Sequence, residues 1–154
     1  MKNGPMSDTT WHIPDPDTQP QFYADIPLKR LLAWGVDTVL VIVICLLIVP
    51  FTAFTGLFFF PLLFLTVGFI YRVLTISQGS ATWGMRLFAI EFRTLSGERF
   101  DGSMAFMHTA IFSMCWAFMP VQILSVFMIA SSRRAQGIPD QILGTVALNR
   151  RARA

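Results

Sequence analysis

Three long apolar runs, separated by polar segments, dominate the pattern of this chain. The first covers residues 31–49 and the second 57–76. A helix needs about 20 mostly apolar residues to cross the roughly 30 Å of bilayer hydrocarbon, so these runs predict two transmembrane helices. The uncharged residues 50–56 between them contain proline and glycine, which predicts a tight turn. Arg72, close to the end of the second run, is expected to reach out to the lipid headgroups.

The third apolar run, residues 104–130, fits a single span poorly. A helix over all of it would be about 40 Å long, whereas two halves broken at Pro120 would each reach about 20 Å. If the run turns back near Pro120, all 12 Lys and Arg residues lie on the same side of the membrane. The positive-inside rule favours that arrangement, so we expect a re-entrant segment or helical hairpin, with one kinked span as the alternative.

Two short β-prone stretches flank the third run. Residues 87–93 have apolar side chains at alternate positions, and residues 145–148 read Thr-Val-Ala-Leu. A lone strand is not stable in water, so the two are expected to pair at the cytoplasmic surface. The sequence therefore predicts an all-α membrane protein with two transmembrane helices, a bent third apolar segment and a small cytoplasmic β-element.

The two ends of the chain differ from this membrane domain, which we place at residues 27–148. Residues 1–26 are polar and rich in proline, which predicts a disordered tail. They lack the apolar core and cleavage site of a signal peptide, so the first span is expected to direct insertion with the N-terminus in the cytoplasm. Residues 149–154 form a basic C-terminal tail.

Composition supports a membrane protein and argues against several other classes. Hydrophobic residues make up 54% of the chain and charged residues 14%, against about a quarter charged in soluble domains. The net charge is +3, and the lysines and arginines lie mainly near the ends of the apolar runs. That distribution fits membrane topology, so the expected partner is the lipid bilayer and not nucleic acid. Cys45 and Cys115 lie inside apolar runs, and neither His12 nor His108 has a partner at metal-ligand spacing. We therefore expect no metal site and no cofactor.

One acid, Asp37, lies inside the first run. Insertion of an aspartate near a helix centre costs roughly 3 kcal/mol, so it marks a functional site unless a structural partner accounts for it. Arg30 lies two helical turns earlier on the same face, but helical side chains lean towards the N-terminus, away from Asp37. We expect Arg30 to contact Asp140 at the cytoplasmic surface and Asp37 to be bound by Arg86 or by backbone donors. Asp140 follows Pro139 and is expected to cap the N-terminus of a helix.

Three short motifs occur in a fixed order around these acids. Residues 29–33 read Lys-Arg-Leu-Leu-Ala before Asp37, residues 81–87 read Ala-Thr-Trp-Gly-Met-Arg-Leu, and residues 139–145 read Pro-Asp-Gln-Ile-Leu-Gly-Thr. Together they resemble the RDD family of small bacterial membrane proteins, named for one arginine and two aspartates. Met85 stands where that family usually has lysine, and Pro139 where His or Gly is common. The resemblance implies a charge network of Arg30, Asp37 and Asp140, supported by Ala33, Thr82, Gly84, Arg86, Gly144 and Thr145.

The resemblance implies a location in the bacterial inner membrane and no enzymatic activity, with cation–proton exchange proposed for some members. The residues themselves offer no nucleophile, base and orienting acid in a polar segment, so no enzyme is expected. We favour an accessory, assembly or interaction subunit of a larger membrane complex, contacting other subunits or self-associating. The alternative is a cation- or proton-handling transporter subunit that uses Asp37.

Overall fold

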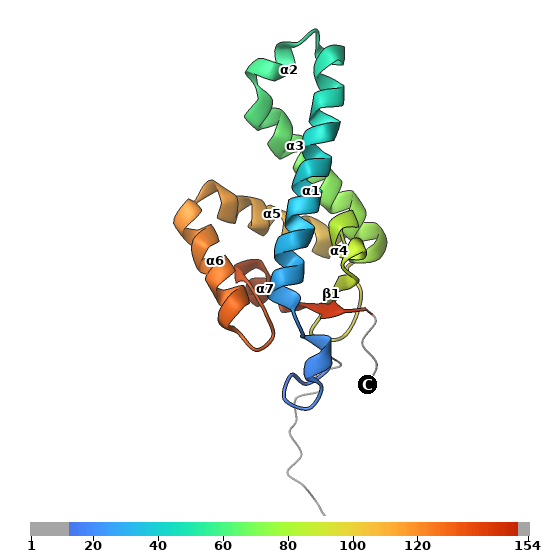
Figure 1. Ribbon diagram of the computed structural model, residues 1–154, viewed down its shortest axis with the longest axis vertical. Coiled ribbons are helices and arrows are strands. Elements are labelled where there is room, and N and C mark those ends of the chain that lie inside the picture. Colours follow the sequence, from blue (N-terminus) through green and yellow to red (C-terminus); the bar gives the residue numbers. More distant parts are fainter. Residues whose placement is uncertain (1–12, 151–154) are drawn as a thin grey trace, which may run out of the picture.

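Two long helices form the axis of the molecule. Apart from the short connection that joins them at the far end, the remaining elements gather around their other end (Figure 1). The computed structural model describes residues 13–150. Both long helices are apolar and long enough to cross a membrane, as the sequence predicts. They are α1 (Ile26–Ile48) and α3 (Phe60–Gly79), joined at the far end by η2 (Val49–Thr52) and α2 (Thr55–Phe58).

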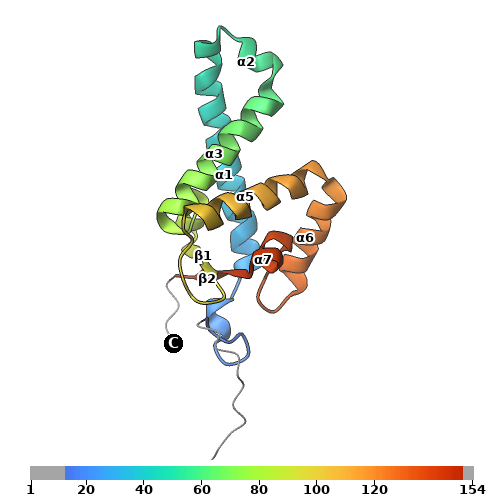
Figure 2. The same ribbon diagram turned by 180° about the vertical axis from the view of Figure 1, so that it is seen from behind.

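The third apolar run is a bent pair of helices. Helix α5 (Gly102–Ala117) and helix α6 (Met119–Ser131) are bent by 120° at the break between them. Pro120 lies in the first turn of α6, where its missing N–H is not needed by the helix. Figures 1 and 2 show α5 running across α1 and α3, and α6 turning back towards the sheet. The break therefore falls next to the predicted position.

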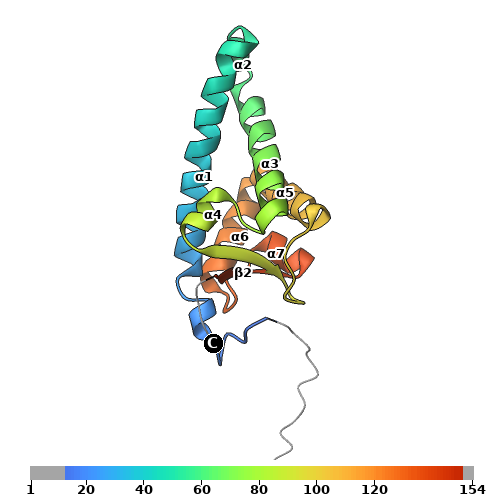
Figure 3. The same ribbon diagram turned by 90° about the vertical axis from the view of Figure 1, so that its right-hand side faces the viewer.

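A small sheet closes the lower end of the molecule. The strands β1 (Ile90–Thr94) and β2 (Thr145–Asn149) pair antiparallel, with Phe92 opposite Ala147, so the predicted pairing is present. Because β1 precedes α5 and β2 follows α6, both ends of the bent segment return to the same end of the molecule (Figure 3). Two short helices, α4 (Trp83–Leu87) and α7 (Ile138–Leu143), lie beside the strands.

The apolar core lies where α1, α3 and α5 meet this sheet. Its fully buried members include Ile26, Ile76, Ile90 and Ala105. The upper halves of α1 and α3 instead present large apolar side chains outward, among them Leu47 and Leu62, which are 65% and 64% exposed. Such a surface is unfavourable in water but suits hydrocarbon.

The segment before α1 differs from the expected disordered tail. Ile13 and Tyr23 are buried against Val146 and Leu148, and Tyr23 Oη donates to Pro14 O at 2.8 Å. Two apolar side chains thus fix residues 13–25 on the sheet despite their polar, proline-rich composition. A short 3-10 helix, η1 (Pro20–Phe22), lies within this segment. The rest of the predicted tails, residues 1–12 and 151–154, lies outside the described residues.

Candidate functional site

The carboxylate of Asp37 is buried at the meeting point of α1, α3 and α4, and only 5% of the residue is exposed. Its Oδ1 accepts from Tyr71 Oη at 2.6 Å and from the Gly84 backbone N–H at 2.8 Å. Its Oδ2 accepts from Thr82 Oγ1 at 2.5 Å. We call these four residues the Asp37 cluster. Three neutral donors offset the cost of burying the charge, so Asp37 does not face bare hydrocarbon.

The contact between α1 and α4 requires very small residues. A Cβ on Gly84 would lie 2.3 Å from the carbonyl oxygen of Ala33 and 2.8 Å from Asp37 Oδ1. Thr82 caps α4, because its Oγ1 accepts from Met85 N at 3.2 Å while its hydroxyl donates to Asp37. The Thr-x-Gly spacing therefore delivers one hydroxyl and one backbone N–H to the same carboxylate.

Arg86, the expected side-chain partner of Asp37, does not contact it. Its guanidinium donates to Thr75 O at 3.0 Å and to Ala81 O at 3.2 Å, near the C-terminal end of α3. Residues 84 and 86 point about 200° apart around a helix, so a glycine facing α1 directs Arg86 away from it. Arg86 instead satisfies free carbonyls at a helix end. The prediction of Arg86 was wrong, and that of a backbone donor was met by Gly84.

A second buried carboxylate, Asp140, lies nearer the sheet. Arg30 Nη1 donates to its Oδ2 at 2.6 Å, the contact that the sequence predicts. Gly137 N also donates to Oδ2, at 3.0 Å, while Thr145 Oγ1 donates to Oδ1 at 3.1 Å. His108 Nε2 lies 2.9 Å from Oδ1. We call these five residues the Asp140 cluster.

The position of Asp140 in its helix differs from the predicted N-cap. Gly137 is the N-cap of α7, and Asp140 sits three residues later, reaching back to the Gly137 N–H. Gly144 ends α7 with φ of 62°, a conformation that glycine adopts without strain. The turn at Gly144 brings Thr145 directly onto the carboxylate.

Asp140 is held as an anion. Burial on its own would raise the pKa of this carboxyl, but Arg30, His108 and the Gly137 N–H together lower the pKa well below its ordinary value. Arg30 also donates to Ala135 O at 3.0 Å, which fixes the guanidinium in place. The pair therefore ties α1 to α7 and to the loop before it.

Sequence reasoning missed His108 and Tyr71. His108 is fully buried on α5, with its ring centroid 4.6 Å from that of Phe92. Its Nδ1 is buried without a hydrogen-bond partner among residues 13–150. Both residues are polar groups inside otherwise uncharged apolar runs, and that is the signal that could have found them.

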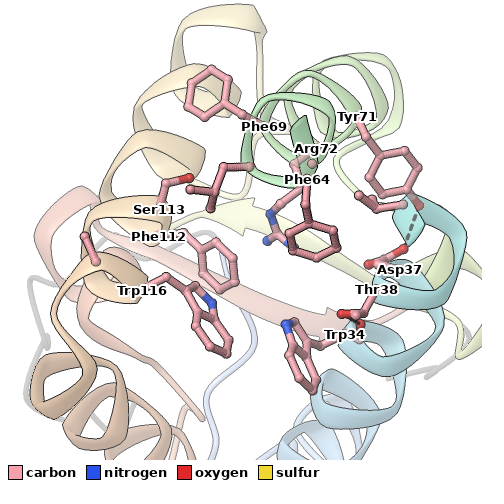
Figure 4. A pocket seen from close by; sticks show the side chains of 14 residues that line it. Trp34, Asp37, Thr38, Phe64, Phe69, Tyr71, Arg72, Phe112, Ser113 and Trp116 are labelled. Carbon is pink, nitrogen blue, oxygen red and sulfur yellow. Dashed lines mark hydrogen bonds between the residues drawn. The ribbon is translucent and has the colours of Figure 1, made fainter. Parts of the chain in front are cut away.

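Arg72 also departs from expectation, because its guanidinium points inward and not out to the headgroups. Its Cζ lies 4.0 Å from the ring centroid of Phe112, in a space between α1, α3 and α5 (Figure 4). Asp37 and Tyr71 line the same space. Across the described part of the chain, no three His, Cys, Asp or Glu side chains are grouped to hold a metal ion.

The chain was compared with protein families, curated proteins and solved structures. The RDD family model matches residues 26–144, a stretch that contains Arg30, both buried aspartates and the Thr-x-Gly contact. No curated protein and no solved structure matches the chain. Since the match covers most of the sequence, the chain belongs to the RDD family.

Proposed function

We propose that this protein is a non-enzymatic subunit that acts through assembly or interaction within a larger membrane complex. The proposal rests on one observation: every oxygen of the two buried carboxylates accepts at least one hydrogen bond from the protein. Asp37 and Asp140 together accept from α1, α3, α4, α5, the N-cap of α7 and the first residue of β2. Each of these donors directs a proton at a carboxylate oxygen, which is the opposite of what a bound cation needs.

The hydrogen bonds to the two buried carboxylates hold several helices together, and we call each carboxylate with its donors a clamp. Removing one partner of a buried, charged contact costs about 3–5 kcal/mol, whereas the intact contact adds little net stability. Such contacts select one arrangement of the helices, and that arrangement presents a defined outer surface. The two buried carboxylates therefore support the shape of the protein, and that shape is what a different partner subunit would recognise.

For the topology, we propose the bacterial inner membrane with the sheet and the N-terminus in the cytoplasm. The bent α5–α6 pair then enters and leaves on the cytoplasmic side without crossing fully. This placement keeps the described lysines and arginines on or near one face, in agreement with the positive-inside rule.

Purification in mild detergent tests the proposed function. The tagged full-length chain, expressed at its natural level in its own host, should elute with a partner at fixed stoichiometry, measured by native mass spectrometry. A variant with a broken clamp, Asp140→Asn, should lose that partner. Elution of the wild-type chain alone, as a monomer or a clean homo-oligomer, would contradict a role within a larger hetero-complex.

One observation favours a second candidate, a cation- or proton-handling transporter subunit. Asp37 and Tyr71 line the space between α1, α3 and α5, so the buried carboxylate borders a cavity at the level of the spans. If the protein transports ions by this route, the flux of protons or sodium should depend on Asp37.

A further inference from the structure

Two cavities meet at Arg72. One, of about 310 Å³, lies between α1, α3 and α5, and the other, of about 550 Å³, extends between α1, α5 and α6. Both volumes are in the range of small-molecule sites. The walls that they share are formed by Trp34, Asp37, Arg72, Phe112 and Trp116.

Arg72 brings an unpaired positive charge to this junction. None of the described residues accepts a hydrogen bond from it or forms an ion pair with it, and its Nε is buried without a partner. The neighbouring Asp37 has both oxygens taken by Tyr71, Thr82 and Gly84. The other cation in the lining, Arg30, is bound to Asp140. Of the two cations that line the cavities, Arg72 is thus the one that forms no ion pair with a described acid.

The surroundings of Arg72 define what could bind there. Its guanidinium lies over the ring of Phe112 and lines both cavities (Figure 4). A guanidinium is a planar set of N–H donors, which suits a two-point contact with an oxyanion. The rest of the lining is apolar, including Val41 and Phe64 in the first cavity and Leu31 and Ile123 in the second. A free inorganic anion would gain nothing from these walls, whereas an amphiphile would cover them.

The depth of Arg72 agrees with a lipid as that amphiphile. Arg72 lies seven residues before the end of α3 at Gly79, about 10 Å along the helix. Trp34 and Trp116 stack at 5.6 Å beside it, and indole rings are typical of the level where headgroups meet hydrocarbon. We propose that Arg72 binds the phosphate of an anionic phospholipid, whose acyl chains lie along the apolar walls of the two cavities.

Lipid retention measured by native mass spectrometry tests this proposal. The full-length chain is equilibrated with mixed micelles that contain phosphatidylcholine and phosphatidylglycerol, and the lipid that stays bound is counted. The wild-type chain should retain phosphatidylglycerol over phosphatidylcholine, and Arg72→Met should lose that preference about tenfold. Arg72→Lys should keep part of it, because lysine keeps the charge and loses the fork of donors. Arg133→Met, which removes an exposed arginine paired with Asp17, is the matched control and should match the wild type.

A second variant blocks the cavity without removing a charge. A Cβ on Gly68 would lie 3.7 Å from its nearest neighbour, Val41 Cγ1, so Gly68→Leu can place its side chain in the first cavity. It should retain less phosphatidylglycerol than the wild-type chain, and this result tests the proposal even if Arg72→Met does not fold. Full retention in every folded variant would overturn the proposal. Displacement of the lipid by inorganic phosphate, or Arg72-dependent binding of phosphate alone, would overturn the proposal of a lipid site and show a site for free anions.

Discussion

Arg30 Nη1 lies 2.6 Å from Asp140 Oδ2, although 110 positions separate the two residues in the chain. The contact joins the N-terminal part of α1 to the short helix α7, which precedes β2. Asp140 is fully buried and the Arg30 side chain is 15% exposed. Removing either residue would therefore leave a buried charge without its partner and destabilise the fold. This contact closes the fold at the end that carries the sheet.

Breaking this pair should therefore destabilise the protein strongly. Arg30→Met and Asp140→Asn should each cost about 3–5 kcal/mol in the free energy of unfolding, and the double variant should cost less than the sum by about 0.5–3 kcal/mol. Reversible unfolding in mixed micelles measures all three. Arg133→Met is the control, because its ion pair with Asp17 is largely exposed and should contribute at most about 1 kcal/mol. Additive effects would contradict a direct coupling.

Gly84→Ala should destabilise by at least about 1–3 kcal/mol, because the new Cβ would overlap the Ala33 carbonyl and force α4 away from Asp37. Gly35→Ala in α1 is the matched control. A Cβ at Gly35 meets nothing within 4 Å, so that variant should gain up to about 1 kcal/mol from helix propensity. The same unfolding assay compares them, and equal stabilities would show that the close contact is not required.

The lowered pKa of Asp140 sets the pH range in which the clamp holds. A carboxyl whose pKa is lower in the folded state stabilises the fold above its ordinary pKa, near 3.9, and loses that contribution as the pH falls through the lowered value. The difference in stability between wild type and Asp140→Asn should stay constant from pH 7 to about pH 5 and shrink only below about pH 4. A difference that disappears between pH 7 and pH 5 would contradict a depressed pKa.

Cysteine labelling tests whether the third apolar segment turns back. Thr55, Ser96 and Arg150 are exposed, and single cysteines there can be introduced after Cys45 and Cys115 are replaced by alanine. In intact cells, a membrane-impermeant maleimide should label Thr55→Cys, and it should label Ser96→Cys and Arg150→Cys only after permeabilisation. Labelling of Ser96→Cys and Arg150→Cys from opposite sides would require a single crossing.

The sequence predicts the parts of this fold that follow from local pattern and overall charge. The two long helices follow from the lengths of their apolar runs, and the direction in which helical side chains lean turns Arg30 away from Asp37, towards the end of the helix where Asp140 was expected. The strand pairing follows from the instability of a lone strand. Each of these inferences needs only one physical rule.

The missed features depend on distances that no local pattern contains. Tyr71 reaches Asp37 because α1 and α3 cross at one particular depth, and His108 reaches Asp140 because α5 runs across them. Arg72 has enough length to reach the headgroups, and only the position of Phe112 shows that it turns inward. Residues 13–25 were misjudged because Ile13 and Tyr23 are too few to alter the composition of a polar segment.

In the proposed function, Asp37 is a structural acceptor and not an ion site. Proton and sodium flux into proteoliposomes tests it most directly, with the full-length wild-type chain compared with Asp37→Asn and with empty liposomes. All three should show the same background flux for both ions. Flux in the wild-type proteoliposomes that falls to background in Asp37→Asn, with both proteins folded and equally incorporated, would contradict it.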